Sequence, residues 1–243
     1  MAGYRLLTGS PALGTGAVVD GLGDRDYFGN PVGGTVSRGA YNGLGVEPVV
    51  FRSIEEAYNN VGVSSDLNPN TGGFSTSGRS YSGQGLEAAG LVPGKIVNVL
   101  GADFVWHPRP YGAVDNVKVA GQTIKLAGQG SKLVFLGAGA FKVREAVFKV
   151  TYTDGTVDDK TVKFGDQWEA AAPAGGVVVA RSQYHNMTHY KSPATGQTRE
   201  SGVSVFGYAV PLDPAKTVAT VTFPQGSPLA DAGFHVFDTK IAD

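Results

Sequence analysis

The feature that most constrains the fold is a series of short apolar or alternating runs between residues 95 and 241, each closed by turn residues. Runs such as Lys95–Leu100 and Lys132–Gly137 have the usual length of a β-strand and are too short for a stable helix. This part of the chain therefore predicts strands joined by turns. The expected strands are 95–100, 104–106, 117–126 with a turn near 120–121, 132–137, 146–153, 156–164, 177–180, 203–210, 217–223 and 234–241.

The strongest local signal is Asp154-Gly155, which stands between the alternating runs 146–153 and 156–164. Two alternating runs around an Asp-Gly pair are the strongest short-range signal for a β-hairpin. Helical periodicity is confined to 53–58 and 85–89, each only one to two turns long. The prediction is an all-β fold, an antiparallel β-sandwich of jelly-roll-like form.

Composition excludes several classes of protein. The chain has 20 Lys+Arg against 21 Asp+Glu and no dense basic run, which argues against a nucleic-acid partner. It has no cysteine, so a disulfide scaffold, a zinc finger and a thiol catalyst are excluded. Its apolar runs are far shorter than the roughly 20 residues that cross a bilayer, so no membrane partner is expected.

The first 48 residues differ from the rest in being dense in glycine and poor in alternation. We therefore expect two parts: an irregular N-terminal arm, 1–48, and a β-sandwich module, 49–243. The N-terminus lacks the basic and long apolar regions of a secretory signal peptide. The chain is expected to be either cytosolic as written or a piece of a longer secreted protein.

Nine short segments, in order along the chain, carry a resemblance to a known kind of domain. They are 58–64, 81–86, 91–94, 115–117, 121–124, 133–137, 150–156, 210–218 and 234–237. In this order they resemble a β-sandwich accessory module appended to secreted bacterial carbohydrate-active enzymes, especially those of actinobacteria. The resemblance implies a secreted precursor with a catalytic domain as partner, but it does not imply a defined ligand.

The N-terminal arm resembles something else. Segments 6–12, 24–31 and 39–41 look like the last coil and exit of a right-handed parallel β-helix, a fold that polysaccharide lyases and several glycosidases use. Fewer than 50 residues cannot form such a fold alone, because its coils are stabilised by stacking on one another. We therefore expect the chain to be the C-terminal part of a longer enzyme; an ordinary loop-rich arm is the alternative.

Aromatic side chains near strand ends are the best candidates for carbohydrate binding, since pyranose C–H faces stack on aromatic rings while polar neighbours bind the hydroxyls. The candidates are Trp106, Tyr111, Trp168, Tyr184, His185 and Tyr190. For the two tryptophans the alternative is a plug at an end of the sandwich core, which is slightly favoured.

His185 and His189 have a spacing that would place both on one face of a helix, as in some zinc sites. No glutamate follows His185, and the segment lies between expected strands, so a polar surface loop is favoured over a metal site. His235 lies in an apolar run and is interpreted as a core or edge residue.

Asp66, Asn68 and Asn70 place oxygen ligands at alternate positions, as in the first half of a calcium loop. The following glycine is one position late, and no glutamate closes the loop. An Asx-rich turn is therefore favoured, with a structural calcium ion as the alternative.

No catalytic motif is complete. Glu55-Glu56 are interpreted as the solvated side of a helical turn, and Asp158-Asp159 point to opposite faces of a strand. The favoured function is therefore a non-catalytic module of a secreted polysaccharide-degrading enzyme, with a polysaccharide or oligosaccharide as ligand. The alternatives are a glycoside hydrolase or polysaccharide lyase and a structural spacer.

Overall fold

The computed structural model describes residues 5–21, 23–75, 78–106, 109–141, 145–188, 196–199, 201–225 and 233–243. The chain divides into two compact units, Met1–Val49 and Val50–Asp243. Among the residues just given, all regular elements lie in the second unit. They are β1 (Val50–Phe51), β2 (Val63–Ser64), the 3-10 turn η1 (Pro69–Thr71), β3 (Arg79–Ser82), α1 (Gly83–Ala88), β4 (Ile96–Val99), β5 (Ala102–Val105), β6 (Val117–Lys118), β7 (Thr123–Gly128), β8 (Lys132–Ala140), β9 (Glu145–Tyr152), β10 (Val157–Lys163), β11 (Gly176–Ser182), β12 (His185–Thr188), β13 (Gly196–Arg199), β14 (Val203–Pro211), β15 (Val218–Thr222) and β16 (Gly233–Ala242).

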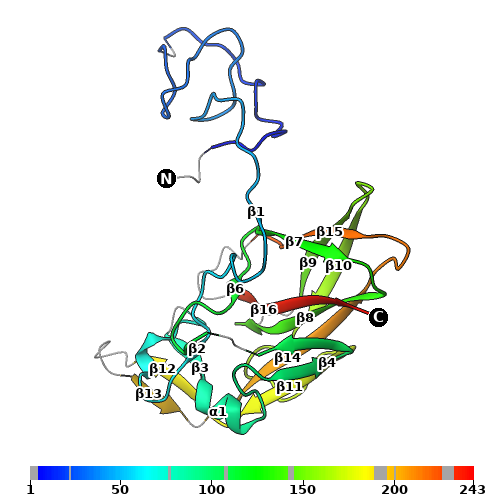
Figure 1. Cartoon of the computed structure of the whole chain (residues 1–243). Helices are drawn as coiled ribbons and strands as arrows, with labels where there is room; N and C mark the ends of the chain where they lie inside the picture. Colours follow the sequence, from blue (N-terminus) through cyan, green and yellow to red (C-terminus); the bar gives the residue numbers. More distant parts are fainter. Residues whose placement is uncertain are drawn as a thin grey trace. The chain divides into compact units, whose positions relative to one another are not determined.

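Two five-stranded sheets form a β-sandwich in the second unit (Figure 1). One has the strand order β1-β7-β15-β9-β10 and the other β11-β14-β8-β16-β6. All pairings within them are antiparallel except that of β1 with β7. The predicted all-β, antiparallel β-sandwich is confirmed. No helix among the described residues is long and apolar enough to cross a membrane.

Phenylalanine rings fill the space between the two sheets. Phe148 of β9 lies 4.8 Å from Phe135 of β8 and 5.8 Å from Phe234 of β16, measured between ring centroids. Phe223, which follows β15, completes the cluster at 5.0 Å from Phe148. All four rings are buried, so apolar burial across the two sheets stabilises the sandwich.

The hairpin of β9 and β10 follows from the Asp154-Gly155 turn. Thr151 pairs with Val157, and Asp154 Oδ1 accepts hydrogen bonds from the main-chain N and the hydroxyl of Thr156. Gly155 has a φ of 83°, a conformation that residues with a Cβ adopt only with strain.

Replacing Gly155 by alanine should lower the free energy of unfolding by about 1–2 kcal/mol, because the left-handed conformation disfavours a Cβ. Gly73→Ala is the matched control, since Gly73 lacks a positive φ and a Cβ there meets no atom within 4 Å. Urea unfolding of both variants measures the difference. Equal stability of the two variants would show that the turn conformation carries no strain.

A smaller sheet, β13-β12-β3-β2, and the helix α1 lie at one end of the sandwich (Figure 1). Ser82 caps α1 by accepting a hydrogen bond from Gly85 N, and Gly85 packs so closely on Ser182 that a Cβ would lie 2.2 Å from its hydroxyl. The helical prediction at 85–89 is therefore confirmed with a shifted start. The helical prediction at 53–58 is wrong, because these residues form turns.

The first unit has only isolated β-bridges and turns in its described residues, 5–21 and 23–49. Its organising group is the Asp26 carboxylate, which accepts hydrogen bonds from Phe28 N, Asn30 N, Asn30 Nδ2 and Asn42 N at 2.5–2.8 Å. Partial burial works against ionisation, but these bonds lower the pKa of Asp26 to about 2. The unit is therefore ordered by polar contacts around a carboxylate.

Candidate functional site

A β-bulge in β16 places the acidic Asp238 and the basic Lys240 on the outer face of the strand, where strict alternation would not put them. The pairing of β16 with β8 shifts register between Val236 and Asp238. Before the shift, Phe234 faces the inside of the sandwich; after it, Thr239 takes the inward position and bonds to Val134 O. Phe237, Asp238 and Lys240 therefore share the outer face of the strand.

The loop between β1 and β2 covers this face of β16. The Tyr58 hydroxyl donates a hydrogen bond to Phe237 O at 2.7 Å. The Arg109 guanidinium lies 5.2 Å from the centroid of the Tyr58 ring and donates to Glu55 O at 3.3 Å. Asp115 fixes the end of the loop, because its carboxylate accepts hydrogen bonds from the main-chain N atoms of Gly62 and Val63.

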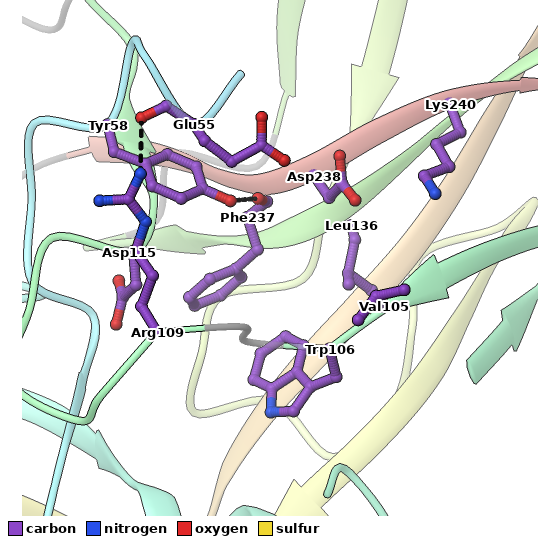
Figure 2. A pocket seen from close by; sticks show the side chains of 10 residues that line it. All are labelled: Glu55, Tyr58, Val105, Trp106, Arg109, Asp115, Leu136, Phe237, Asp238 and Lys240. Carbon is purple, nitrogen blue, oxygen red and sulfur yellow. Dashed lines mark hydrogen bonds between the residues drawn. The ribbon is translucent and has the colours of Figure 1, made fainter. Parts of the chain in front are cut away.

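These elements enclose a cavity of about 210 Å³, shown in Figure 2. Since liquid water occupies about 30 Å³ per molecule, the cavity has room for about seven water molecules or one small ring. Figure 2 shows the carboxylates of Glu55 and Asp238 on one side, with Phe237 and Trp106 extending away from them. The lining residues are Glu55, Tyr58, Val105, Trp106, Arg109, Asp115, Leu136, Phe237, Asp238 and Lys240.

The cavity perturbs the ionisation of its acidic groups. Burial, reinforced by the charge of Glu55, raises the pKa of Asp238 to about 7, although the Thr239 main-chain N–H and Lys240 favour the ionised form. Burial also raises the pKa of Tyr58 far above its usual range, with Asp238 and Glu55 adding to the effect. Tyr58 therefore stays protonated as a donor, and Asp238 exchanges a proton near neutral pH.

Of the six predicted carbohydrate-binding residues, Trp106 is the one that lines this cavity. Its indole is 2% exposed and lies 5.2 Å from the Phe237 ring, with the planes tilted by 59°. The side chain thus belongs to the core cluster and to the cavity wall at once. Trp106 therefore does not offer an exposed ring face on which a sugar could stack.

Tyr111 and Tyr184 lie beside α1, in a separate polar cluster. The Tyr184 hydroxyl donates to Asp66 Oδ2 at 2.7 Å, and the Tyr111 hydroxyl donates to Glu87 Oε1 at 2.6 Å. The Tyr111 ring packs on Gly83, where a Cβ would lie 2.3 Å from it. Two of the six predicted residues are thus brought to one end of the sandwich, each bound to a carboxylate.

Asp66, the first predicted calcium ligand, belongs to this cluster. Its Oδ1 accepts hydrogen bonds from the Ser82 hydroxyl and from Asn186 Nδ2. Asn68 and Asn70 lie in the turn around η1, where Asn68 N donates to Ser65 O. Within the described residues no group of three or more His, Cys, Asp or Glu side chains could hold a metal ion.

Trp168 and His185 form a third group. Their rings meet edge to face at 4.8 Å, and the Arg79 guanidinium lies 5.6 Å from the Trp168 ring centroid. His185 is buried in β12, which pairs with β3. The prediction of a polar surface loop is therefore wrong for 185–188, since these residues complete a sheet. Tyr190 and His189 lie outside the described residues.

His235 has the environment predicted for a core histidine. Its Nδ1 lies 2.9 Å from Asn116 Oδ1, and its ring stacks on Phe74 at 4.0 Å. Burial lowers the pKa of His235 to about 3, so the ring is neutral. This side chain therefore contributes packing and a buried hydrogen bond.

Sequence reasoning did not identify Glu55, Tyr58, Arg109 or Asp238 as members of one site. The sequence places Glu55 on the solvated side of a helical turn. Asp238 stands in an apolar run, where strict alternation would point its side chain to the same face as Phe234. The one local signal is a carboxylate directly after an apolar run, which corresponds to the five buried residues that begin β16; burying such a carboxylate is costly unless a bulge or partner accommodates it.

Comparison with known proteins gives a match to one family model and no match among curated proteins. The model of the AziU2-like beta-sandwich domain matches residues 50–230, which spans most of the second unit.

Proposed function

The chain belongs to the AziU2-like beta-sandwich domain family. We propose that its sandwich unit is a non-catalytic carbohydrate-binding module of a secreted polysaccharide-degrading enzyme. The observation that supports saccharide binding is the cavity, because it joins an aromatic wall to the carboxylates of Glu55 and Asp238. Sugar pockets need this pairing of ring faces with fixed polar partners. Its volume suits one sugar ring rather than a chain, so the module binds a terminal or side-branch residue.

The accessory role draws on the resemblance of segments between residues 58 and 238 to modules of carbohydrate-active enzymes. The first unit supports it in a second way. Val36 and Tyr41 are its buried large apolar residues among those described, while Val18, Val19 and Leu44 are exposed. A unit with so small a core gains stability by stacking on further coils, as the exit of a β-helix does. The genomic sequence upstream of Met1 tests this: further β-helix coils and a signal peptide support it, and an unrelated gene contradicts it.

Saccharide binding is tested by affinity electrophoresis of the full chain in gels containing neutral, amino and acidic polysaccharides. Retention by at least one polysaccharide is expected. Trp106→Phe should weaken retention about fivefold or more, because it alters the cavity wall, while Trp168→Phe should leave retention unchanged. Circular dichroism checks that both variants fold.

The opposite pattern, with Trp168→Phe losing retention and Trp106→Phe keeping it, would place the ligand outside the cavity. Retention by none of the polysaccharides would favour the structural-spacer alternative.

A glycoside hydrolase is the second candidate, favoured by the two carboxylates in one cavity. Asp238, with its pKa near 7, could donate a proton to the glycosidic oxygen as the C–O bond breaks, while Glu55 acts as base for the attacking water or as nucleophile. A reducing-sugar assay, with an assay for unsaturated products to detect a lyase, separates this candidate from the binding module. Product formation that Asp238→Asn abolishes would establish the enzyme.

A further inference from the structure

The carboxylates of Glu55 and Asp238 face one cavity without a cation between them. Among the described residues, neither side chain forms an ion pair, and Asp238 Oδ1 accepts one hydrogen bond, from Thr239 N at 2.7 Å. Two like charges in a partly buried space repel each other and lose hydration. This arrangement is stabilised by a proton or by a cationic group placed between them.

The two cations that line the cavity, Arg109 and Lys240, each contact another group. Arg109 donates to the Glu55 main-chain oxygen and lies against the Tyr58 ring, so Tyr58 separates it from Asp238 (Figure 2). Lys240 Nζ lies over the Phe104 ring, 5.8 Å from its centroid. Among the described residues, neither side chain forms an ion pair with Glu55 or Asp238, although the charge of Lys240 favours the ionised form of Asp238.

The rest of the wall suits a small organic cation better than a metal ion. The rings of Tyr58, Trp106 and Phe237 border the cavity, and aromatic faces attract ammonium groups by cation–π interaction. A calcium ion prefers six to eight oxygen ligands, whereas this cavity offers two carboxylates beside apolar walls, with Asp115 engaged by main-chain donors.

We infer that the ligand of this cavity carries a protonated amino group, which binds between the carboxylates of Glu55 and Asp238, and that the ligand class is therefore an amino sugar. This inference rests on the proposed saccharide-binding function and specifies the substrate class. The sugar ring lies toward Trp106 and Phe237, and the ammonium group donates hydrogen bonds to both carboxylates.

Isothermal titration calorimetry with the full chain tests the inference. The three probes are glucosamine oligosaccharides, their N-acetylated counterparts, which lack the charge, and cello-oligosaccharides, which lack the nitrogen. The free-amine probe should bind at least tenfold more tightly than either of the others. Asp238→Asn and Glu55→Gln should each remove at least tenfold of that affinity while changing the binding of the neutral probes less than twofold.

The chain offers matched controls for both variants. Glu56→Gln alters the adjacent, more exposed carboxylate, which pairs with Arg52, and Asp159→Asn alters an exposed carboxylate on β10. Both controls should bind the amine probe as the unaltered chain does. A loss of affinity in the controls equal to that in the cavity variants would overturn the inference, because general charge would then explain the binding.

The remaining outcomes distinguish a failure of the amine inference from a failure of saccharide binding itself. Equal binding of all three probes would overturn the amine inference and leave saccharide binding standing. Binding of none would contradict saccharide binding itself. Binding of calcium chloride that Asp238→Asn abolishes, without binding of the amine probe, would assign the carboxylates to a metal ion and overturn the inference.

Discussion

Replacing Phe148 by alanine is expected to lower the free energy of unfolding by about 3–5 kcal/mol. Phe148 is fully buried on β9 and contacts rings from β8 and β16 of the facing sheet. Its removal leaves a cavity between two sheets that their hydrogen-bond ladders hold in place, so the neighbouring rings cannot fully collapse into it. Equilibrium urea unfolding, followed by circular dichroism, measures the loss.

Phe141→Ala is the matched control, because Phe141 is 39% exposed. It should cost less than about 1 kcal/mol, since little apolar area is lost. Equal losses in the two variants would mean that Phe148 is not part of a packed interface between sheets. A loss below about 1 kcal/mol for Phe148→Ala would contradict the sandwich core described above.

Asp238→Asn should remove a pH dependence of stability that the unaltered chain shows between about pH 4 and pH 7. Burial raises the pKa of Asp238 to about 7 from the ordinary 3.8, so in this range the folded state binds more protons than the unfolded state. Stability therefore falls as the pH rises through 7. The ionisation of Asp238 changes the free energy of unfolding by at most about 4 kcal/mol over this range, and water in the cavity reduces the change.

The difference in unfolding free energy between Asp238→Asn and the unaltered chain, measured at pH 5 and pH 8, isolates this contribution. The variant should gain relative stability at pH 8, because asparagine stays neutral. The groups that face Asp238 are present in both proteins and cancel: Glu55, Tyr58, Arg109, Asp115 and Lys240. Asp159→Asn, on the exposed side of β10, should keep the original pH profile. A constant difference at both pH values would show that Asp238 ionises with an ordinary pKa.

Most strands of the two large sheets were predictable from the sequence, but β1 was not. Alternating runs around Asp154-Gly155 identified the hairpin of β9 and β10, and short apolar runs identified β8, β14 and β16, which are buried along much of their length. The small sheet was not predictable. In β12 the polar residues His185 and Asn186 are buried, and their pattern resembles that of a loop.

The candidate site was predictable only in part. Trp106 was identified as an aromatic residue at a strand end, and it does line the cavity. Its carboxylate partners were not identified, because Glu55 comes from a loop about 180 residues before Asp238 in the chain. The hydrogen bond from Tyr58 to Phe237 O joins the same distant segments, and such pairings leave no local pattern.

The sequence by itself determined the all-β class, the strand positions and the turn at Asp154-Gly155, because side-chain alternation and turn preferences are local properties of the chain. Only the tertiary structure decided which side of β16 carries Asp238. The bulge inserts one extra residue into β16, so the alternation of inward and outward side chains is reversed after Phe237. The bulge arises from pairing with β8 rather than from the residues of β16 alone. The same pairing brings Asp238 to the cavity that it shares with Glu55 and Trp106.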